Sequence, residues 1–206
     1  GICNPEGNVI ALMPHPERTL NGDPYFASMR EWIQNGRTVK RRSSNTIDAA
    51  KWNLDTHSTK LTEIFIDTII VNNEERTVEQ TAHKYEPALK LKQWKYFAVP
   101  DAAVQELLRD LTLFNPNKER AFIRRGKSIV QWNANAKKEQ KLEGSVLDGS
   151  LLLRRDLPDT GAKKFGDTAE AGLCYACTGI PDERLLERKM LEIFANPHAS
   201  ILEKIQ

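Results

Sequence analysis

Short apolar runs alternate with polar segments along this chain. Residues 9–13 are apolar, follow Gly7 and stop at Pro14, a pattern typical of a buried strand that ends in a loop. Residues 61–71 are rich in isoleucine and predict one strand or a pair of strands. We expect further strands at residues 94–99, 121–123, 128–132 and 173–180.

Four other segments carry apolar residues at helical spacing. The first, residues 23–33, begins with Asp23 as a favourable N-cap and Pro24 at the first helical position, and Gly36 is expected to close it. The other three helices are expected at residues 75–85, 102–114 and 182–194. Strands and helices in this order predict an α+β fold.

The last two predicted helices end alike, which indicates an internal duplication. Asn115-Pro116 follows one helix and Asn196-Pro197 follows the other, and a short apolar segment comes within several residues of each. We therefore expect a duplicated small α+β module with the order strand-helix-strand-strand-helix-strand, from units of roughly 65 residues. The two units are placed at residues 61–133 and 134–206.

Residues 37–60 differ in composition from the segments on either side. Lys40, Arg41 and Arg42 form a basic cluster that serine and asparagine follow. A linker is favoured over a nucleic-acid-binding patch, because no aromatic residue is interleaved with the cluster for base stacking. His57, near the end of this segment, is expected to be an exposed loop residue.

His15 is the main candidate for chemistry. Pro14 and Pro16 restrict the backbone on both sides and so hold the imidazole in one direction. Glu17 can turn back and accept from the ring nitrogen that does not face a substrate, which is how a carboxylate orients the histidine of a nucleophile-His-carboxylate triad. The alternative is a loop histidine and a glutamate at a helix entry, with no chemistry.

These residues resemble the class I, or triad, glutamine amidotransferases, in which His-Pro-Glu follows a strand. Within that class, Gly-Ile-Cys-Asn at residues 1–4, Gly-Asn-Val at 7–9 and Met-Pro-His-Pro-Glu-Arg at 13–18 are most similar to the glutaminase subunit of phosphoribosylformylglycinamidine synthase. The resemblance implies that residues 1–36 are the C-terminal fragment of an α/β glutaminase domain. It also implies that His15 is the general base and that Glu17 orients it.

The same resemblance implies two partners. The family's nucleophilic cysteine lies on a strand-to-helix elbow far upstream of the histidine, so a glutaminase segment that carries it would be needed, and an ATP-dependent synthetase subunit or domain would use the ammonia. Cys3 is expected to be structural, because Pro5 and Gly7 indicate a turn and not a helix N-terminus that could lower a thiol pKa. Glutamine hydrolysis is therefore not expected on this chain alone.

Residues 61–206 resemble the small subunit of the same synthase. The similar segments are Glu-Arg-Thr-Val at residues 75–78, Trp-Lys-Tyr-Phe at 94–97 and Gly-Ser-Val-Leu-Asp at 144–148. The resemblance implies a module that bridges glutaminase and synthetase in purine biosynthesis, where ammonia is transferred to formylglycinamide ribonucleotide. A non-catalytic protein-protein interaction module that retains a glutaminase tail is the alternative.

Cys174 and Cys177 form a C-x-x-C motif, but no second motif supplies the two further ligands that a structural zinc site needs. Buried, unreactive thiols are favoured over a zinc or redox site. No phosphate-binding glycine motif is present, so we expect neither a cofactor nor a metal on this chain.

Composition adds limits to these interpretations. A formal net charge of +2 gives no argument for nucleic acid or for a membrane surface, and no apolar run approaches the length of a spanning helix. The three cysteines, an odd number, fit a reducing cytoplasm better than a disulfide framework. A cytoplasmic location is therefore expected.

Overall fold

The computed structural model describes residues 2–3, 10–11, 13, 15–18, 22–35, 54–142, 144–156 and 162–205. The chain divides into two compact units, Gly1–Ala50 and Lys51–Gln206. Each unit is described by itself. No helix among the described residues is long and apolar enough to cross a membrane.

The first unit contains a two-stranded antiparallel sheet and one long helix. Strand β1 (Ile2–Cys3) pairs with β2 (Ile10–Ala11), so that Cys3 lies opposite Ile10. Helix α1 (Asp23–Asn35) begins at the predicted Asp23, which places an acidic residue in its positive first turn. The predicted helix is confirmed, whereas Gly36 lies outside the described residues.

Helix α1 presents apolar side chains that nothing in its own unit buries. None of its residues is buried, and its five large apolar side chains are between 45% and 71% exposed. They are Tyr25, Phe26, Met29, Trp32 and Ile33.

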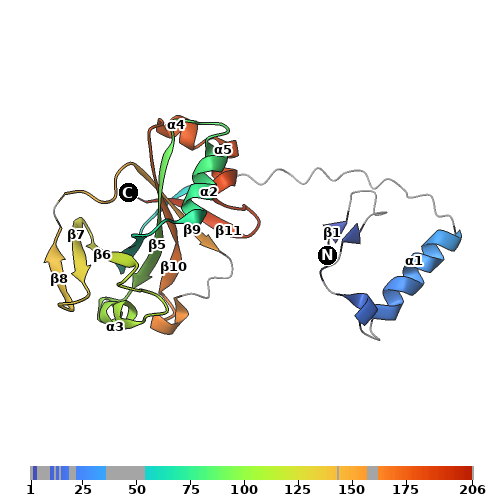
Figure 1. Cartoon of the computed structure of the whole chain (residues 1–206), viewed down its shortest axis with the longest axis horizontal. Coiled ribbons are helices and arrows are strands. Elements are labelled where there is room, and N and C mark those ends of the chain that lie inside the picture. Colours follow the sequence, from blue (N-terminus) through green and yellow to red (C-terminus); the bar gives the residue numbers. More distant parts are fainter. Residues whose placement is uncertain are drawn as a thin grey trace. The chain divides into compact units, whose positions relative to one another are not determined.

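The second unit is built on one sheet of nine strands in the order β3-β11-β9-β10-β5-β4-β6-β7-β8 (Figure 1). All neighbours are antiparallel except β3 and β11, which are parallel. The strands are β3 (Asp55–His57), β4 (Thr62–Thr68), β5 (Lys90–Val99), β6 (Glu119–Arg125), β7 (Ser128–Asn133), β8 (Lys138–Lys141), β9 (Ser150–Asp156), β10 (Glu170–Thr178) and β11 (Ser200–Ile205).

Among the described residues, four α-helices accompany this sheet: α2 (Asn73–Ala82), α3 (Val104–Arg109), α4 (Asp182–Leu185) and α5 (Arg188–Phe194). Side chains alternate across a strand, so β5 shows which face the helices cover. Leu91 and Phe97 of β5 pack in clusters that include residues of α2, α3 and α5, whereas Trp94 and Tyr96 pack in a third cluster that includes no helical residue. The helices therefore cover one face of the sheet, and α2 lies against α5 (Figure 1).

The inner six strands of the sheet are arranged symmetrically about the pair β5 and β10. Strands β5 and β10 are antiparallel, and Trp94 lies opposite Cys174. Outward from this pair, the sheet continues through β4 to β6 on one side and through β9 to β11 on the other. In chain order, β4, β5 and β6 form one set of three strands and β9, β10 and β11 form another. In each set the first strand lies between the second and the third.

Several sequence predictions need correction. The predicted order places two adjacent strands between two helices, but β5 is the one strand between α2 and α3 and pairs along its two edges with β4 and β10. The helix predicted at 182–194 is interrupted, since Glu187 has an extended backbone with ψ of 139°. The helix predicted at 102–114 ends at Arg109, which leaves Leu111 71% exposed.

The segment predicted as a linker, residues 37–60, contains strand β3, which completes one edge of the sheet by pairing with β11. Strand β8 was not predicted, since its four residues are all charged or polar and exposed. The hairpin of β7 and β8 spans the boundary expected at residues 133 and 134. One continuous sheet thus joins the two expected units.

Candidate functional site

The side chains of His15 and Glu17 are in contact. His15 Nδ1 lies 2.8 Å from Glu17 Oε1, and both side chains are more than half exposed. The contact is local, because Pro16–Arg18 form one 3-10 turn in which the Arg18 N–H donates to the His15 carbonyl at 3.0 Å. Since Nδ1 faces the carboxylate, Nε2 is the ring nitrogen left to face a reacting group.

Gly22 explains how the chain turns from this segment into α1. A Cβ atom added at Gly22 would lie 1.8 Å from the carbonyl oxygen of Pro16, so only glycine allows the backbone to approach so closely. This approach holds the start of α1 beside the 3-10 turn that carries Glu17. The predicted candidates His15 and Glu17 are thus placed together by local backbone geometry.

No described cysteine is suited to serve as the nucleophile for this pair. Cys174 and Cys177 are free thiols buried in the second unit. Burial raises the pKa of Cys177 to about 12 and also raises the pKa of Cys174, so both stay protonated at neutral pH. Both thiols are buried, as predicted. The backbone of Cys3 lies on β1, while its side chain lies outside the described residues.

A second polar cluster, absent from the sequence interpretation, lies inside the second unit. The Tyr96 hydroxyl lies 2.9 Å from His57 Nε2 and donates to Glu63 Oε1 at 3.0 Å. Arg124 in turn holds both carboxylate oxygens of Glu63, at 2.6 and 2.7 Å. His57, Glu63 and Tyr96 are each less than a tenth exposed. We call these four side chains, with Glu203 and Arg155, the buried polar network.

Glu203 and Arg155 extend the network toward β3. His57 Nδ1 lies 3.2 Å from Glu203 Oε2, which accepts from Arg155 Nη2 at 2.7 Å. Because Tyr96 donates to Glu63, His57 Nε2 must donate to Tyr96, and Nδ1 faces a carboxylate. Both ring nitrogens of His57 thus have a polar partner, and the carboxylates of Glu63 and Glu203 each contact an arginine.

The prediction that His57 is an exposed loop residue is wrong. It lies on β3 and is only 7% exposed, because β3 pairs with β11 and brings the ring beside Tyr96. Glu203 is 146 positions away in the sequence, and no local spacing could reveal this contact. The usable signal in the sequence is Glu63, a charged residue directly before the apolar run Ile64, Phe65 and Ile66.

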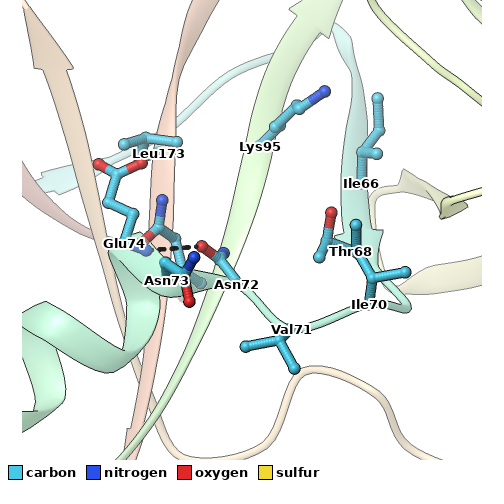
Figure 2. Close-up of a pocket in the computed structure, with 10 residues that line it drawn as sticks. Ile66, Thr68, Ile70, Val71, Asn72, Asn73, Glu74, Lys95 and Leu173 are labelled. Carbon is cyan, nitrogen blue, oxygen red and sulfur yellow. Dashed lines mark hydrogen bonds between the residues drawn. The ribbon is translucent and has the colours of Figure 1, made fainter.

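A pocket of about 280 Å³ opens on the helix-covered face beside the first turn of α2 (Figure 2). Ile66 and Thr68 come from β4, Lys95 from β5 and Leu173 from β10, and the loop into α2 closes the remaining side. Gln93 of β5 also lines it. Gln93 lies one residue before the strand predicted at 94–99, so the apolar pattern gives no indication of it.

No group of histidine, cysteine and acidic side chains among the described residues could hold a metal ion. Comparison with protein-family models, with curated proteins and with solved structures finds no match to this chain.

Proposed function

We propose that the chain is part of phosphoribosylformylglycinamidine synthase and contributes the histidine and the carboxylate of its glutaminase triad. The contact of His15 Nδ1 with Glu17 Oε1 at 2.8 Å is the observation that carries this proposal. It matches the arrangement in which a carboxylate orients a general base and leaves the other ring nitrogen for the nucleophile. The exposure of both side chains supports it too, since the pair is open to a thiol from another segment.

In this mechanism the nucleophile comes from a glutaminase segment outside the described residues. His15 Nε2 takes the proton of that thiol, and the thiolate attacks the carbon of the glutamine side-chain amide. The same nitrogen returns the proton to the leaving ammonia, and water then hydrolyses the thioester to glutamate. Glu17 holds the imidazole in place throughout. The ammonia passes to an ATP-dependent synthetase, which this chain would bridge to the glutaminase.

Helix α1 supports the need for a partner. Its five large apolar side chains are exposed, and an apolar helix face of this kind is stabilised when another surface covers it. The segment that carries the cysteine is the occupant we propose. Docking on α1 would bring that segment close to the turn that carries His15, because Gly22 holds the helix start beside Pro16.

We further propose that the second unit is an internal duplication, in which β4, β5 and β6 correspond to β9, β10 and β11. Loop contacts support this correspondence. Asn115 Oδ1 accepts the N–H of Asn117 at 3.1 Å, and Asn196 Oδ1 accepts the N–H of His198 at 2.9 Å. The two asparagines precede corresponding strands, and each lies fifteen residues after a proline that begins a helical segment, Pro100 or Pro181.

A second repeated contact supports the same correspondence. The Thr62 hydroxyl, at the start of β4, donates to Asp101 Oδ1 at 2.9 Å, and the Ser150 hydroxyl, at the start of β9, donates to Asp182 Oδ1. Each aspartate directly follows the proline of its half. A module of two such halves would present a glutaminase on one side and a synthetase on the other.

A complementation assay tests the proposed activity. The chain is mixed with a separately produced glutaminase segment that carries the cysteine, and sedimentation velocity establishes that the two associate. We expect no glutamate formation by either part alone and formation after mixing. His15→Ala should abolish it, and Glu17→Gln should lower kcat by about 10³- to 10⁴-fold, as for loss of an orienting carboxylate. His198→Ala, an exposed histidine of the second unit, is the matched control.

Association without any glutamate formation would overturn the catalytic proposal. It would favour the alternative, a non-catalytic interaction module that uses α1 as a docking surface. The exposed apolar face of α1 is the observation that supports this second function.

A further inference from the structure

Gln93 is the unexplained feature of the pocket beside α2. Its side chain is only 5% exposed, yet its Oε1 atom is buried and accepts no hydrogen bond from any described residue. A buried acceptor without a partner destabilises the folded protein. Such a group calls for a physical reason, and Gln93 lies in the wall of a pocket large enough for a small molecule.

The sheet itself does not require a polar side chain at this position. Gln93 directly precedes Trp94, and Leu173 directly precedes Cys174, the residue opposite Trp94 in the central strand pair. Gln93 and Leu173 therefore lie on the same, helix-covered face of the sheet, and this face accepts a leucine beside the pocket. Both residues line the pocket. Gln93 thus places a buried amide beside an apolar side chain in the wall of the pocket.

The surrounding charges indicate what the pocket can hold. Two N–H groups in the first turn of α2 are already used, because Asn72 Oδ1 accepts from Glu74 N at 3.1 Å (Figure 2) and from Glu75 N at 3.2 Å. The ammonium of Lys95 is also engaged, by Glu119 Oε1 at 2.5 Å. An anion would find these donors taken and would meet the carboxylate of Glu74 at the rim.

A cation is no better suited than an anion. It would meet the positive end of α2 and the ammonium of Lys95. A neutral group that donates an N–H to Gln93 Oε1 avoids both conflicts. Thr68 and Asn73 add polar atoms to the lining, whereas Ile66, Ile70, Val71 and Leu173 form an apolar part of the wall that suits a hydrocarbon or aromatic body.

We propose that this pocket binds a small neutral molecule that carries a primary carboxamide, or an equivalent N–H donor, on an apolar body. The N–H group donates to Gln93 Oε1, and the apolar body packs between Ile66, Ile70 and Leu173. Ile70 and Val71 are 56% and 64% exposed and form an apolar rim that such a ligand would cover. The site lies wholly in the second unit and is independent of the His15–Glu17 pair.

Benzamide and N,N-dimethylbenzamide test the proposal on the unaltered full chain. The two probes share an aromatic body and a carbonyl, but only benzamide has N–H donors. We expect benzamide to produce saturable NMR shifts of the Ile66, Ile70, Val71 and Leu173 methyl groups, and the dimethyl analogue to bind at least about tenfold more weakly, the value of one hydrogen bond of 1.4 kcal/mol. Equal affinities, or no saturable shifts at millimolar benzamide, overturn it.

A variant adds an independent readout. Gln93→Met keeps the side-chain length but removes the buried acceptor, so the urea midpoint of the free protein should rise while discrimination between the two probes is lost. Gln80→Met, an exposed position on α2, is the matched control and should leave discrimination intact. The proposal is overturned if Gln93→Met lowers the urea midpoint and still discriminates between the two probes. This result would mean that a fixed water binds to Oε1 in the unaltered protein. The comparison of probes on the unaltered chain does not depend on this variant folding.

Discussion

Tyr96 donates a hydrogen bond to Glu63 across the interior of the sheet, at 3.0 Å from hydroxyl to carboxylate. The same hydroxyl meets His57 at 2.9 Å, so one oxygen joins β5 to β4 and to the edge strand β3. Tyr96→Phe leaves buried polar groups of both neighbours without this partner. We expect it to lower the free energy of unfolding by about 1–3 kcal/mol in urea titrations. Tyr85→Phe, at a side chain 52% exposed, should change it little.

Arg124 and Glu63 provide a sharper test of how this network stabilises the sheet. Their positions on β6 and β4 correspond, in the proposed duplication, to Ile205 and Leu151, which pair directly on β11 and β9. Arg124→Ile alone would leave Glu63 charged and buried, at a cost of about 3–5 kcal/mol. The double variant Glu63→Leu/Arg124→Ile should lower the free energy of unfolding by less than Arg124→Ile alone does. Urea unfolding of all three proteins measures this coupling.

A suitable control for that cycle lies on the same strand. Arg125 is 37% exposed at its side chain and pairs with Asp101 at 2.6 Å, so Arg125→Ile should cost less than about 1 kcal/mol. A double variant at Glu63 and Arg124 that is less stable than Arg124→Ile would contradict the account given for this pair.

Two carboxylates of α2 protect the part of β5 that β4 does not reach. Glu75 Oε2 accepts the N–H of Gln93 at 2.7 Å, and Glu79 Oε1 accepts the N–H of Leu91 at 3.0 Å. In Glu75→Ala and Glu79→Ala, hydrogen exchange should become faster at Gln93 and at Leu91 respectively, because each variant removes one acceptor. Gln80→Ala on the same helix should leave both amides protected. Unchanged exchange in the glutamate variants would mean that these contacts do not hold the strand.

Asp101 and Asp182 test the proposed duplication through their ionisation. The Arg125 guanidinium, and then the Thr62 hydroxyl, lower the pKa of Asp101, while the Lys204 ammonium, and then the Ser150 hydroxyl, lower the pKa of Asp182. Thr62→Val should raise the pKa of Asp101 only, and Ser150→Ala that of Asp182 only, as measured by carboxyl ¹³C NMR. Because both values are lowered, their contribution to stability is present above the unfolded pKa near 4 and is lost as the pH falls through the folded pKa.

Alkaline pH should weaken the core around β10. Burial raises the pKa of both Cys177 and Tyr175 to about 12, above unfolded values of about 8.5 and 10. The protonated side chains of Cys177 and Tyr175 contribute fully to the free energy of unfolding below the unfolded pKa values. This contribution is lost as the pH rises toward 12. The free energy of unfolding should therefore fall above about pH 9. Cys177→Ala should reduce the slope by up to about 1.4 kcal/mol per pH unit; an unchanged slope would assign the loss to other groups.

Local patterns in the sequence were sufficient for those parts of the fold that local forces determine. Asp23 and Pro24 mark the beginning of α1, and the contact of His15 with Glu17 spans two residues, so both could be anticipated. The strands at 94–99 and 128–132 were found from their apolar residues. Strand β3 forms by pairing with β11, which is adjacent in the sheet but lies near the other end of the unit's sequence. The residues next to β3 in the sequence therefore do not indicate this pairing.

The interruption of the helix near Glu187 shows the same limit. No glycine or proline lies between Asp182 and Phe194, and the apolar spacing is that of one helix. Both parts nevertheless bury apolar residues in one cluster, Leu185 from α4 and Leu191 from α5. The core that they share therefore decides the break, through tertiary packing that outweighs helix propensity.

The two ends of the nine-stranded sheet have a bearing on how this protein behaves at high concentration. At one end β8 reads Lys-Glu-Gln-Lys with every side chain in water, and at the other β3 has only three residues. Pairing of a strand from a second molecule with β8 would desolvate the lysine side chains. Pairing with β3 would give few hydrogen bonds, because β3 is short. Such borders discourage fibril growth, so the large sheet can remain a discrete building block in an assembly.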